Sequence, residues 1–321
     1  MKNNIIKVIL FMAVFSGIAF MIHYGFLSAF RRFDNEEIGI WNKVVHGTIN
    51  ADLVISGDSR ALTAYDCRVI SAVTQLSCFN LSVNGNLIDI QLARLRLLLK
   101  YNKHPKVLIQ VLGRSTLELS TPSNPLQFVP FLNEIELYSA LRQTENKDIF
   151  VKAKLLPLYG FSYFRIRRSL NIVDDLFAPN PSDTRINGYL PVYSFWNLDI
   201  QQFKNMHKDG ITGALSTEGL ENLKMLIRTC RENNIKLILV TAPMYVEGRE
   251  LFTNKDEILS AYEEIARENN LPYLNYFSHP MTNNQNNFYD FQHTNILGAK
   301  VISEKLADDI NSIILSRKPD R

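Results

Sequence analysis

Apolar residues are distributed differently near the N-terminus and in the remainder of the chain. Residues 8–22, VILFMAVFSGIAFMI, form a run without a charged side chain. After residue 50, short runs of apolar and β-branched residues alternate with stretches in which apolar residues recur every three or four positions. The first pattern indicates one long apolar helix, and the second is typical of strands that alternate with amphipathic helices.

The strands that the second pattern predicts are short and mostly apolar. Such runs occur at residues 51–56, 77–83, 107–112, 236–241 and 273–276. Helical periodicity occurs at residues 88–99, from residue 217 onward, and at residues 295–315. Strands that alternate with helices along a chain usually pair in parallel, with helices covering the sheet. The sequence therefore predicts a three-layer α/β/α sandwich around a mainly parallel, five-stranded sheet.

Residues 118–216 do not follow this alternation. They are rich in proline and aromatic residues and show no clear succession of strands and helices. A long irregular segment in a compact domain is usually either functional or wrongly assigned to irregular structure. We therefore interpret 118–216 as an insertion between the third strand and its next helix, at the strand ends where open α/β sheets bind ligands.

The apolar run near the N-terminus is long enough to cross a bilayer. It extends with little interruption to Phe30, and basic residues flank it on both sides. A membrane-spanning helix needs about 20 mostly apolar residues. We expect residues 1–30 to be an uncleaved membrane anchor, 31–50 a linker and 51–321 the folded domain. A cleaved signal peptide is the alternative, but the FLSAF sequence is a poor cleavage site.

Composition and charge restrict the function further. Apolar residues make up 46% of the chain, so it can bury a sizeable core, and a net charge of +3 is too small for a nucleic-acid binder. The three cysteines lack the spacing of a zinc site; Cys67 and Cys78 form a disulfide, or they are buried free thiols. Neither His207 nor His279 has evident metal-binding partners, and we expect no metal or cofactor.

A serine follows the first predicted strand at a position suited to chemistry. The strand ends on Gly57, Asp58 and Ser59, with Arg60 directly behind them. The carboxyl ends of parallel strands form the ligand crevice, and N–H groups at a helix start face developing negative charge. We expect Asp58 to hold the turn through backbone N–H groups. Arg60 either binds an anionic or sugar substrate or pairs with an acid.

A serine needs a neighbouring base to act as a nucleophile, and one is available near the other end of the chain. The sequence YDFQHTN places Asp290 three residues before His293, just ahead of the last predicted helix. In a loop this spacing lets the carboxylate reach one imidazole nitrogen while the other faces Ser59. The alternative is that Asp290 only caps the helix and His293 is an ordinary surface residue.

Together these two motifs resemble the SGNH, or GDSL-like, hydrolases. The first block of that family is Gly-Asp-Ser and its last is Asp-x-x-His, matched here by Gly57-Asp58-Ser59 and by Asp290 with His293. The resemblance covers roughly residues 51–312. It implies a flavodoxin-like fold and a triad of Ser59, His293 and Asp290. The family's second block implies that the backbone N–H of Gly85 joins that of Ser59 in an oxyanion hole.

The third family block, Gly-x-Asn-Asp, is not matched. The corresponding sequence VLGRSTLE keeps Gly113 and places Ser115 where the family has its asparagine. A serine hydroxyl reaches less far than an amide, and losing an oxyanion donor costs about 10²–10³ in rate. Asn84 or Asn86 are substitutes, and both are also candidate substrate contacts. Tyr245, which follows the fourth strand, is a candidate wall of the substrate crevice.

The incomplete third block and the apolar N-terminus resemble a divergent, membrane-anchored branch of the family. That branch includes proteins of alginate acetylation and teichoic-acid D-alanylation. The resemblance implies a single-pass membrane protein with its domain on the extracytoplasmic, periplasmic side. Its expected substrate is an acylated cell-surface carbohydrate, a membrane protein that donates acyl groups is an expected partner, and no nucleic acid is expected.

Two functions follow from these expectations. The first is a serine esterase or O-acyltransferase that works through an acyl-serine intermediate. The alternative is a scaffold or polysaccharide-binding component of a cell-envelope system that kept the fold and lost turnover. The unmatched third block motivates the alternative, whereas the intact Ser59, Asp290 and His293 favour the enzyme.

Overall fold

The computed structural model describes residues 2–113, 116–118, 122–175, 184–196, 200–213 and 215–315. They fall into two compact units, one of residues 1–43 and 121–183 and the other of residues 44–120 and 184–321. We call these unit 1 and unit 2. Unit 2 contains the sheet and every described residue of the sequence motifs.

Unit 2 is built on the predicted parallel sheet. Its strands are β1 (Leu53–Ser56), β2 (Cys78–Asn80), β3 (Val107–Leu112), β4 (Lys236–Thr241) and β5 (Tyr273–Asn275). They are arranged in the order β2-β1-β3-β4-β5, and every adjacent pair is parallel. All residues of β1 and β3 are buried, which explains why these strands read as continuous apolar runs rather than as an alternating pattern.

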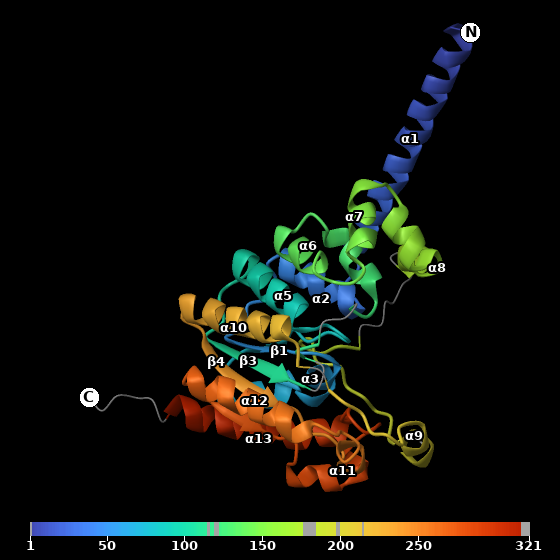
Figure 1. Cartoon of the computed structure of the whole chain (residues 1–321). Coiled ribbons are helices and arrows are strands. Elements are labelled where there is room, and N and C mark those ends of the chain that lie inside the picture. The colour runs from blue at the N-terminus through green and yellow to red at the C-terminus, as the bar shows by residue number, and fades with distance from the viewer. Residues whose placement is uncertain are drawn as a thin grey trace. The chain divides into compact units, whose positions relative to one another are not determined.

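Helices cover both faces of this sheet (Figure 1). On one face α5 (Ile88–Tyr101) packs against α10 (Thr217–Glu232), and on the other α4 (Cys67–Thr74) packs against α13 (Ile296–Leu315). The remaining helices of unit 2 are α3 (Ser59–Ala64), α9 (Ile200–Met206), α11 (Val246–Arg249), α12 (Lys255–Glu268), η2 (Pro280–Asn283) and η3 (Gln285–Asn287). This confirms the predicted α/β architecture.

The main apolar core of unit 2 lies between the sheet and α13. The apolar stripe of this helix includes Ile302, Leu306 and Ile310, all fully buried against side chains from β1, β3 and β4. Each fully buried side chain of this kind contributes roughly 1.5–3 kcal/mol. The core holds the start of α13, and the loop that precedes it, against the carboxyl ends of the strands.

Unit 1 consists of helices from two separate segments of the chain, residues 1–43 and 121–183. It contains α1 (Lys2–Phe30), most of α2 (Glu36–Val45), η1 (Pro125–Phe131), α6 (Ile135–Leu141), α7 (Lys147–Leu155) and α8 (Tyr159–Asp175). Trp41 is fully buried, and its indole N–H donates to Gln127 Oε1 at 3.0 Å. The ring of Phe161 is also fully buried and lies 5.2 Å from that of Phe26 and 5.0 Å from that of Phe30.

The predicted boundaries require three corrections. Residues 31–50, expected to be a linker, contain α2 with the buried Trp41. Much of the insertion 118–216 is helical, and residues 121–183 belong to unit 1 with the N-terminal segment. The second strand ends at Asn80 rather than at residue 83, although the N–H groups of Leu81 and Val83 still donate to the carbonyls of Ile55 and Gly57.

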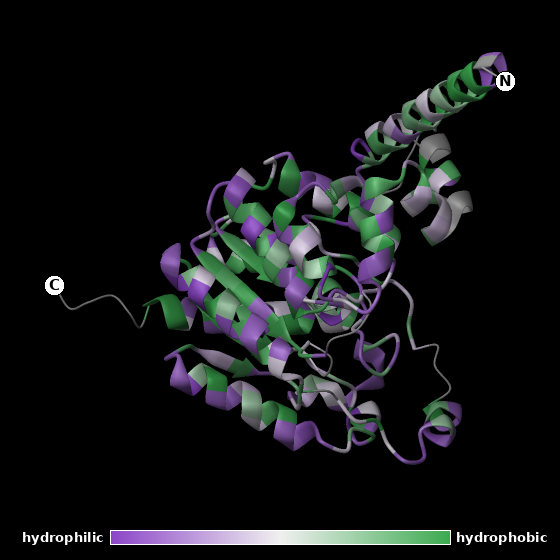
Figure 2. Cartoon of the chain, turned by 45° about the horizontal axis from the view of Figure 1, so that its top comes forward, coloured by the Kyte–Doolittle hydropathy of each residue, from purple (hydrophilic) through white to green (hydrophobic). Residues whose placement is uncertain are grey.

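The helix α1 is long and apolar enough to cross a membrane. Figure 2 shows apolar residues along its length, in contrast to the mixed surfaces of the other helices. Protein covers none of its most apolar stretch, so a row of large apolar side chains is exposed. The two cysteines for which a disulfide was considered are free, buried thiols.

Candidate active site

The turn after β1 is shaped by Gly57 and Asp58. Asp58 is the N-cap of α3, and its Oδ1 accepts the backbone N–H of Arg60 at 3.0 Å, as the sequence predicts. A Cβ on Gly57 would lie 2.6 Å from the Cβ of Ala61, so glycine is needed here for space and not for an unusual φ angle. The turn places Ser59 at the first position of α3, beyond the carboxyl end of β1.

The loop before α13 is shaped by Asp290. Its Oδ1 accepts the backbone N–H groups of Gln292 and His293, each at 2.9 Å. The same carboxylate accepts a bond from His293 Nδ1, at 2.8 Å from Oδ2. One side chain therefore fixes both the backbone of its loop and the orientation of the imidazole, which explains the three-residue spacing.

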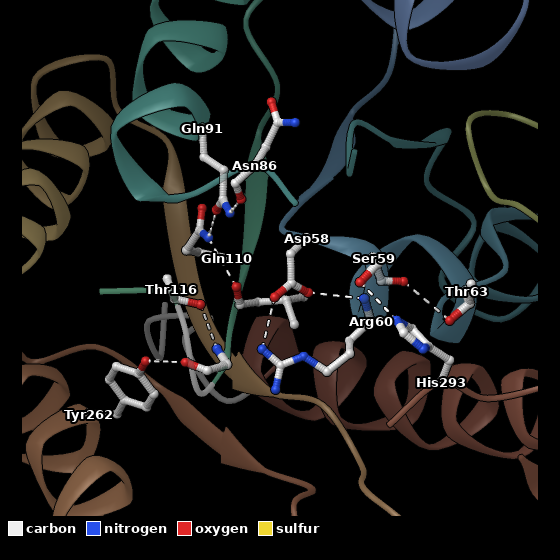
Figure 3. A network of polar contacts seen from close by, with 12 residues as sticks. Asp58, Ser59, Arg60, Thr63, Asn86, Gln91, Gln110, Thr116, Tyr262 and His293 are labelled. Atoms are coloured by element: carbon white, nitrogen blue, oxygen red, sulfur yellow. Dashed lines mark hydrogen bonds and ion pairs between the residues drawn. The ribbon is translucent and has the colours of Figure 1, made fainter. Parts of the chain in front are cut away.

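The structure brings these two sequence-distant loops together. Ser59 Oγ lies 2.8 Å from Nε2 of His293 (Figure 3). Because Nδ1 faces the carboxylate of Asp290, its proton is held there and Nε2 is left to accept from the serine. This arrangement can remove the proton of the Ser59 hydroxyl.

A second contact fastens the two loops. Thr63 Oγ1 donates to the carbonyl of Ser59 at 3.2 Å within α3, and Thr294 Oγ1 donates to the carbonyl of Thr63 at 3.0 Å. Thr294 is almost fully buried. Thr63, one helical turn after Ser59, is thereby bonded to the residue that follows His293, so a second hydrogen bond also joins the two segments.

Charge at the site is dominated by two carboxylates. Burial opposes ionisation of Asp290, but the hydrogen bond and charge of His293, with two backbone N–H groups, outweigh it and lower the pKa of Asp290. Burial also opposes ionisation of Asp58, whereas the charge and hydrogen bonds of Arg60 lower its pKa overall. Asp290 is thus held as an anion that can stabilise a protonated His293.

Arg60 pairs with Asp58, and it also lines a small, mostly apolar pocket beside Gly113 and Tyr262. Its Nη2 lies 2.8 Å from Asp58 Oδ2, and its side chain is 5% exposed (Figure 3). The guanidinium occupies the space beside Gly113, where a Cβ would lie 1.1 Å from Nη2. Of the two predicted roles of Arg60, the structure thus supports the ion pair rather than a direct contact with substrate.

The other predicted site residues have different surroundings. Gly85 is half-buried with φ of +57°, a left-handed conformation that favours glycine. Asn84 beside it is exposed, whereas Asn86 is fully buried, donates to the carbonyl of Asn84 and accepts from Arg94. The interior amide of Asn86 is therefore not an exposed substrate contact. Ser115 lies outside the described residues.

A buried polar network supports the loop that carries Gly85. Gln91 Nε2 donates to the carbonyl of Asn86 at 2.6 Å, and Gln91 Oε1 accepts from Gln110 Nε2 at 2.6 Å (Figure 3). Gln110 lies on β3, so the network connects this loop to the sheet. This support could not be predicted from the sequence, because glutamine in an apolar run has no distinctive local pattern.

Aromatic side chains surround the histidine loop. The ring of Tyr289 stacks on His293 with centroids 5.4 Å apart. This contact was not predicted, although an aromatic residue next to Asp290 is a visible signal in the sequence. Tyr245 is largely buried, with its ring 4.8 Å from that of Trp196 and its hydroxyl donating to Glu247. Tyr245 thus forms part of the wall beneath the loop rather than an exposed surface.

Part of the insertion lies beside the site. The backbone N–H of Leu190 donates to the carbonyl of Leu62 in α3, and the N–H of Ile296 donates to the carbonyl of Val192. Residues 184–196 therefore run between the serine helix and the start of α13. Among the residues that the structure describes, histidine, cysteine and acidic side chains form no group suited to a metal ion.

Comparison with known proteins adds little to this geometry. No protein-family model matches the chain, and no curated protein does. Solved structures with a similar fold include an acylhydrolase candidate from Bacteroides fragilis, at 12% identity and a TM-score of 0.40, over 82% of this chain and 87% of that one.

Another is a candidate lipolytic protein of the G-D-S-L family from Desulfitobacterium hafniense, at 12% identity and a TM-score of 0.37. The match covers 80% of this chain and 98% of that one. At such low similarity neither protein establishes an activity for this chain. The functional conclusion therefore depends on the residues of the site.

Proposed function

We propose that the protein is a membrane-anchored serine esterase or O-acyltransferase that acts on acyl esters of cell-surface carbohydrate. The observation that carries the proposal is the continuous chain of hydrogen bonds from Ser59 Oγ through His293 to Asp290, with contacts of 2.8 Å on both sides of the imidazole. A hydroxyl held in this way, at the carboxyl end of a strand, is an activated nucleophile.

The proposed reaction proceeds in two steps. Ser59 Oγ bonds to the acyl carbon while its proton moves to His293 Nε2; the ester C–O bond breaks, and the departing alcohol takes that proton. Water or a sugar hydroxyl then bonds to the acyl carbon of the acyl-serine and gives its proton to Nε2; the bond from the acyl carbon to Ser59 Oγ breaks, and Oγ takes that proton from Nε2. Asp290 stabilises the imidazolium, and the N–H groups of Ser59 and Gly85 are the proposed oxyanion donors.

The substrate class and the anchor are supported by different features. The Gly57-Asp58-Ser59 and Asp290-x-x-His293 motifs favour ester chemistry, and their resemblance to envelope-modifying proteins motivates carbohydrate as substrate. The uncovered apolar helix α1 supports anchoring. We place unit 2 on the extracytoplasmic side, where such polymers and a membrane acyl donor are accessible.

A fluorophosphonate probe tests the nucleophile directly. The full-length protein in detergent should be labelled, and Ser59→Ala should lose the label, whereas Ser312→Ala, which removes an exposed serine of α13, should retain it. Folding of each variant is checked by circular dichroism. Folded protein without Ser59-dependent labelling would exclude the enzyme and favour the alternative, a polysaccharide-binding component.

The acceptor and the substrate class need a second assay. Purified protein is incubated with an O-acetylated polysaccharide, and released acetate is compared with acetate transferred to an added oligosaccharide. Ser59-dependent release indicates an esterase, and Ser59-dependent transfer indicates an acyltransferase. If the probe labels Ser59 but neither product forms, the assignment of Ser59 as nucleophile stands and the carbohydrate substrate is contradicted.

A further inference from the structure

The last turns of α1 pack against the other helices of unit 1, whereas its earlier turns do not. This boundary limits the part of the helix that a bilayer can surround. Its last turns pack on α8, where the buried ring of Phe161 contacts Phe26 and Phe30. The backbone N–H of Leu158 also donates to Nδ1 of His23 at 3.2 Å. The part of the helix that precedes these contacts, residues 3–21, is roughly 28 Å long at 1.5 Å per residue. This length is close to the hydrocarbon thickness of about 30 Å.

The connection between α7 and α8 lies beside the turn of α1 that contains His23 and Tyr24. A hollow of about 180 Å³ is lined by Phe20, Tyr24 and Leu27 of α1 and by Lys154 and Leu155 of α7, among other residues of unit 1. These residues surround one space, so the end of α7 lies beside the turn of α1 at which the free apolar stretch ends.

Apolar side chains are exposed at this junction. Leu155 is 72% exposed and Leu156 is 50% exposed, although they follow each other at the end of a helix. Tyr24 on the adjacent turn of α1 is 64% exposed. Large apolar side chains that are exposed side by side indicate a surface with a partner.

The neighbouring charges favour a lipid headgroup layer as that partner. Lys152 and Lys154, in the last turn of α7, are both exposed, and the ammonium of Lys154 lies 3.8 Å from the ring centroid of Tyr138. Lysines beside exposed leucines, with a tyrosine at the same level, are typical of segments in the membrane interface.

We propose that Tyr24, Lys152, Lys154, Leu155 and Leu156 form a membrane-contact surface that lies in the interfacial layer of the bilayer that α1 enters. The apolar side chains of Leu155 and Leu156 insert below the headgroups, while Lys152 and Lys154 contact lipid phosphates. This inference rests on the anchoring part of the proposed function and is independent of the chemistry at Ser59. It gives unit 1 the role of fixing the depth of the helix.

The experiment uses a fluorescent probe attached to single exposed cysteines in the full-length chain. Leu155→Cys tests the surface, Phe15→Cys tests the anchor, and Leu315→Cys is a similarly exposed control on unit 2. The three native cysteines are buried, and the unsubstituted chain measures their background labelling. Each protein carries an environment-sensitive NBD label. It is reconstituted into phosphatidylcholine–phosphatidylglycerol vesicles with or without nitroxide-bearing lipids.

We expect the probe at Leu155→Cys to shift to shorter wavelength on reconstitution and to lose most of its emission with a nitroxide near the headgroup. The probe at Phe15→Cys should be quenched most by a nitroxide deep in the acyl chains, and the probe at Leu315→Cys by neither. If Leu155→Cys behaves like Leu315→Cys while Phe15→Cys is quenched, the anchor stands and the contact surface is wrong.

Two further results would overturn the inference in other ways. A wavelength shift at Leu155→Cys without lipid quenching would mean that protein, such as a second copy of the chain, covers this surface. Absence of quenching at Phe15→Cys would contradict the anchor itself. Neither result affects the fluorophosphonate test of Ser59, so failure of the enzyme proposal remains distinguishable.

Discussion

Asp290 organises the site because it binds its own loop and the imidazole at once. In Asp290→Asn an amide replaces the anion, so it no longer stabilises the imidazolium and can favour the wrong tautomer of His293. We expect ester hydrolysis to fall by about 10⁴-fold in kcat. Hydrolysis of an activated aryl acetate measures this loss, and activity close to that of the unmodified protein would contradict the assigned role.

The lowered pKa of Asp290 also predicts a dependence of stability on pH. A carboxyl whose pKa is lower in the folded state stabilises the fold above its unfolded pKa, near 3.8, and this contribution is lost as pH falls through the folded value. The unmodified protein should therefore exceed Asp290→Asn in unfolding free energy at pH 7 by more than at pH 3. Urea denaturation at both pH values measures the two differences, which would be equal if the carboxylate made no such contribution.

The ion pair of Arg60 with Asp58 predicts a contribution to stability that substitution of either residue can test. Both side chains are largely buried, so Arg60→Met leaves the carboxylate without its partner and should destabilise the protein by about 3–5 kcal/mol. The double variant Arg60→Met with Asp58→Asn should recover much of this loss, because no buried charge remains. Denaturation of these two variants, of Asp58→Asn alone and of the unmodified protein completes a double-mutant cycle, and additive losses would contradict the pairing.

At the scale of one helix, α5 contains an acid in an unfavourable place. Asp89 is 5% exposed in the first turn, and burial raises its pKa to about 6 despite bonds from backbone N–H groups. Between about pH 4 and 6 the folded state binds the extra proton, so stability should fall as pH rises through this range. Asp89→Asn should remove this dependence and stabilise the protein at pH 7 by roughly 1–3 kcal/mol.

Denaturation of both proteins across pH 4–7 measures this effect. Gln201→Glu, at an exposed position of α9, is a control for adding a carboxylate at the surface and should change stability little. If the unfolding free energies of Asp89→Asn and of the unmodified protein change with pH in parallel, ionisation of Asp89 does not destabilise the fold and the prediction is wrong.

At the scale of the whole molecule, the anchor proposed for α1 predicts how the protein is recovered from cells. The exposed apolar surface of this helix predicts that the protein stays with membranes in high salt and at alkaline pH and is released by detergent. Fractionation with immunodetection measures this distribution. Release by a salt wash would indicate attachment through charge and contradict a spanning helix.

The sequence predicted the sheet well because its signals are local. β3 and β4 have the expected boundaries, since apolar runs buried on both faces need no knowledge of their neighbours. Ser59, Asp290 and His293 were also recognisable, because each motif carries its own turn-forming contacts. The capping of α3 by Asp58 and the loop bonds of Asp290 each span only a few residues.

Only the tertiary structure decided what depends on contacts between distant segments. The union of residues 1–43 with 121–183 rests on the packing of Phe161 against α1 and on the bond from Trp41 to Gln127, which leave no periodic pattern. The pairing of Arg60 with Asp58, rather than with substrate, required the space beside Gly113. The sequence alone determined which groups can react, because side-chain chemistry and local turns are encoded residue by residue. Folding decided which of them meet, because that depends on packing between elements far apart in the chain.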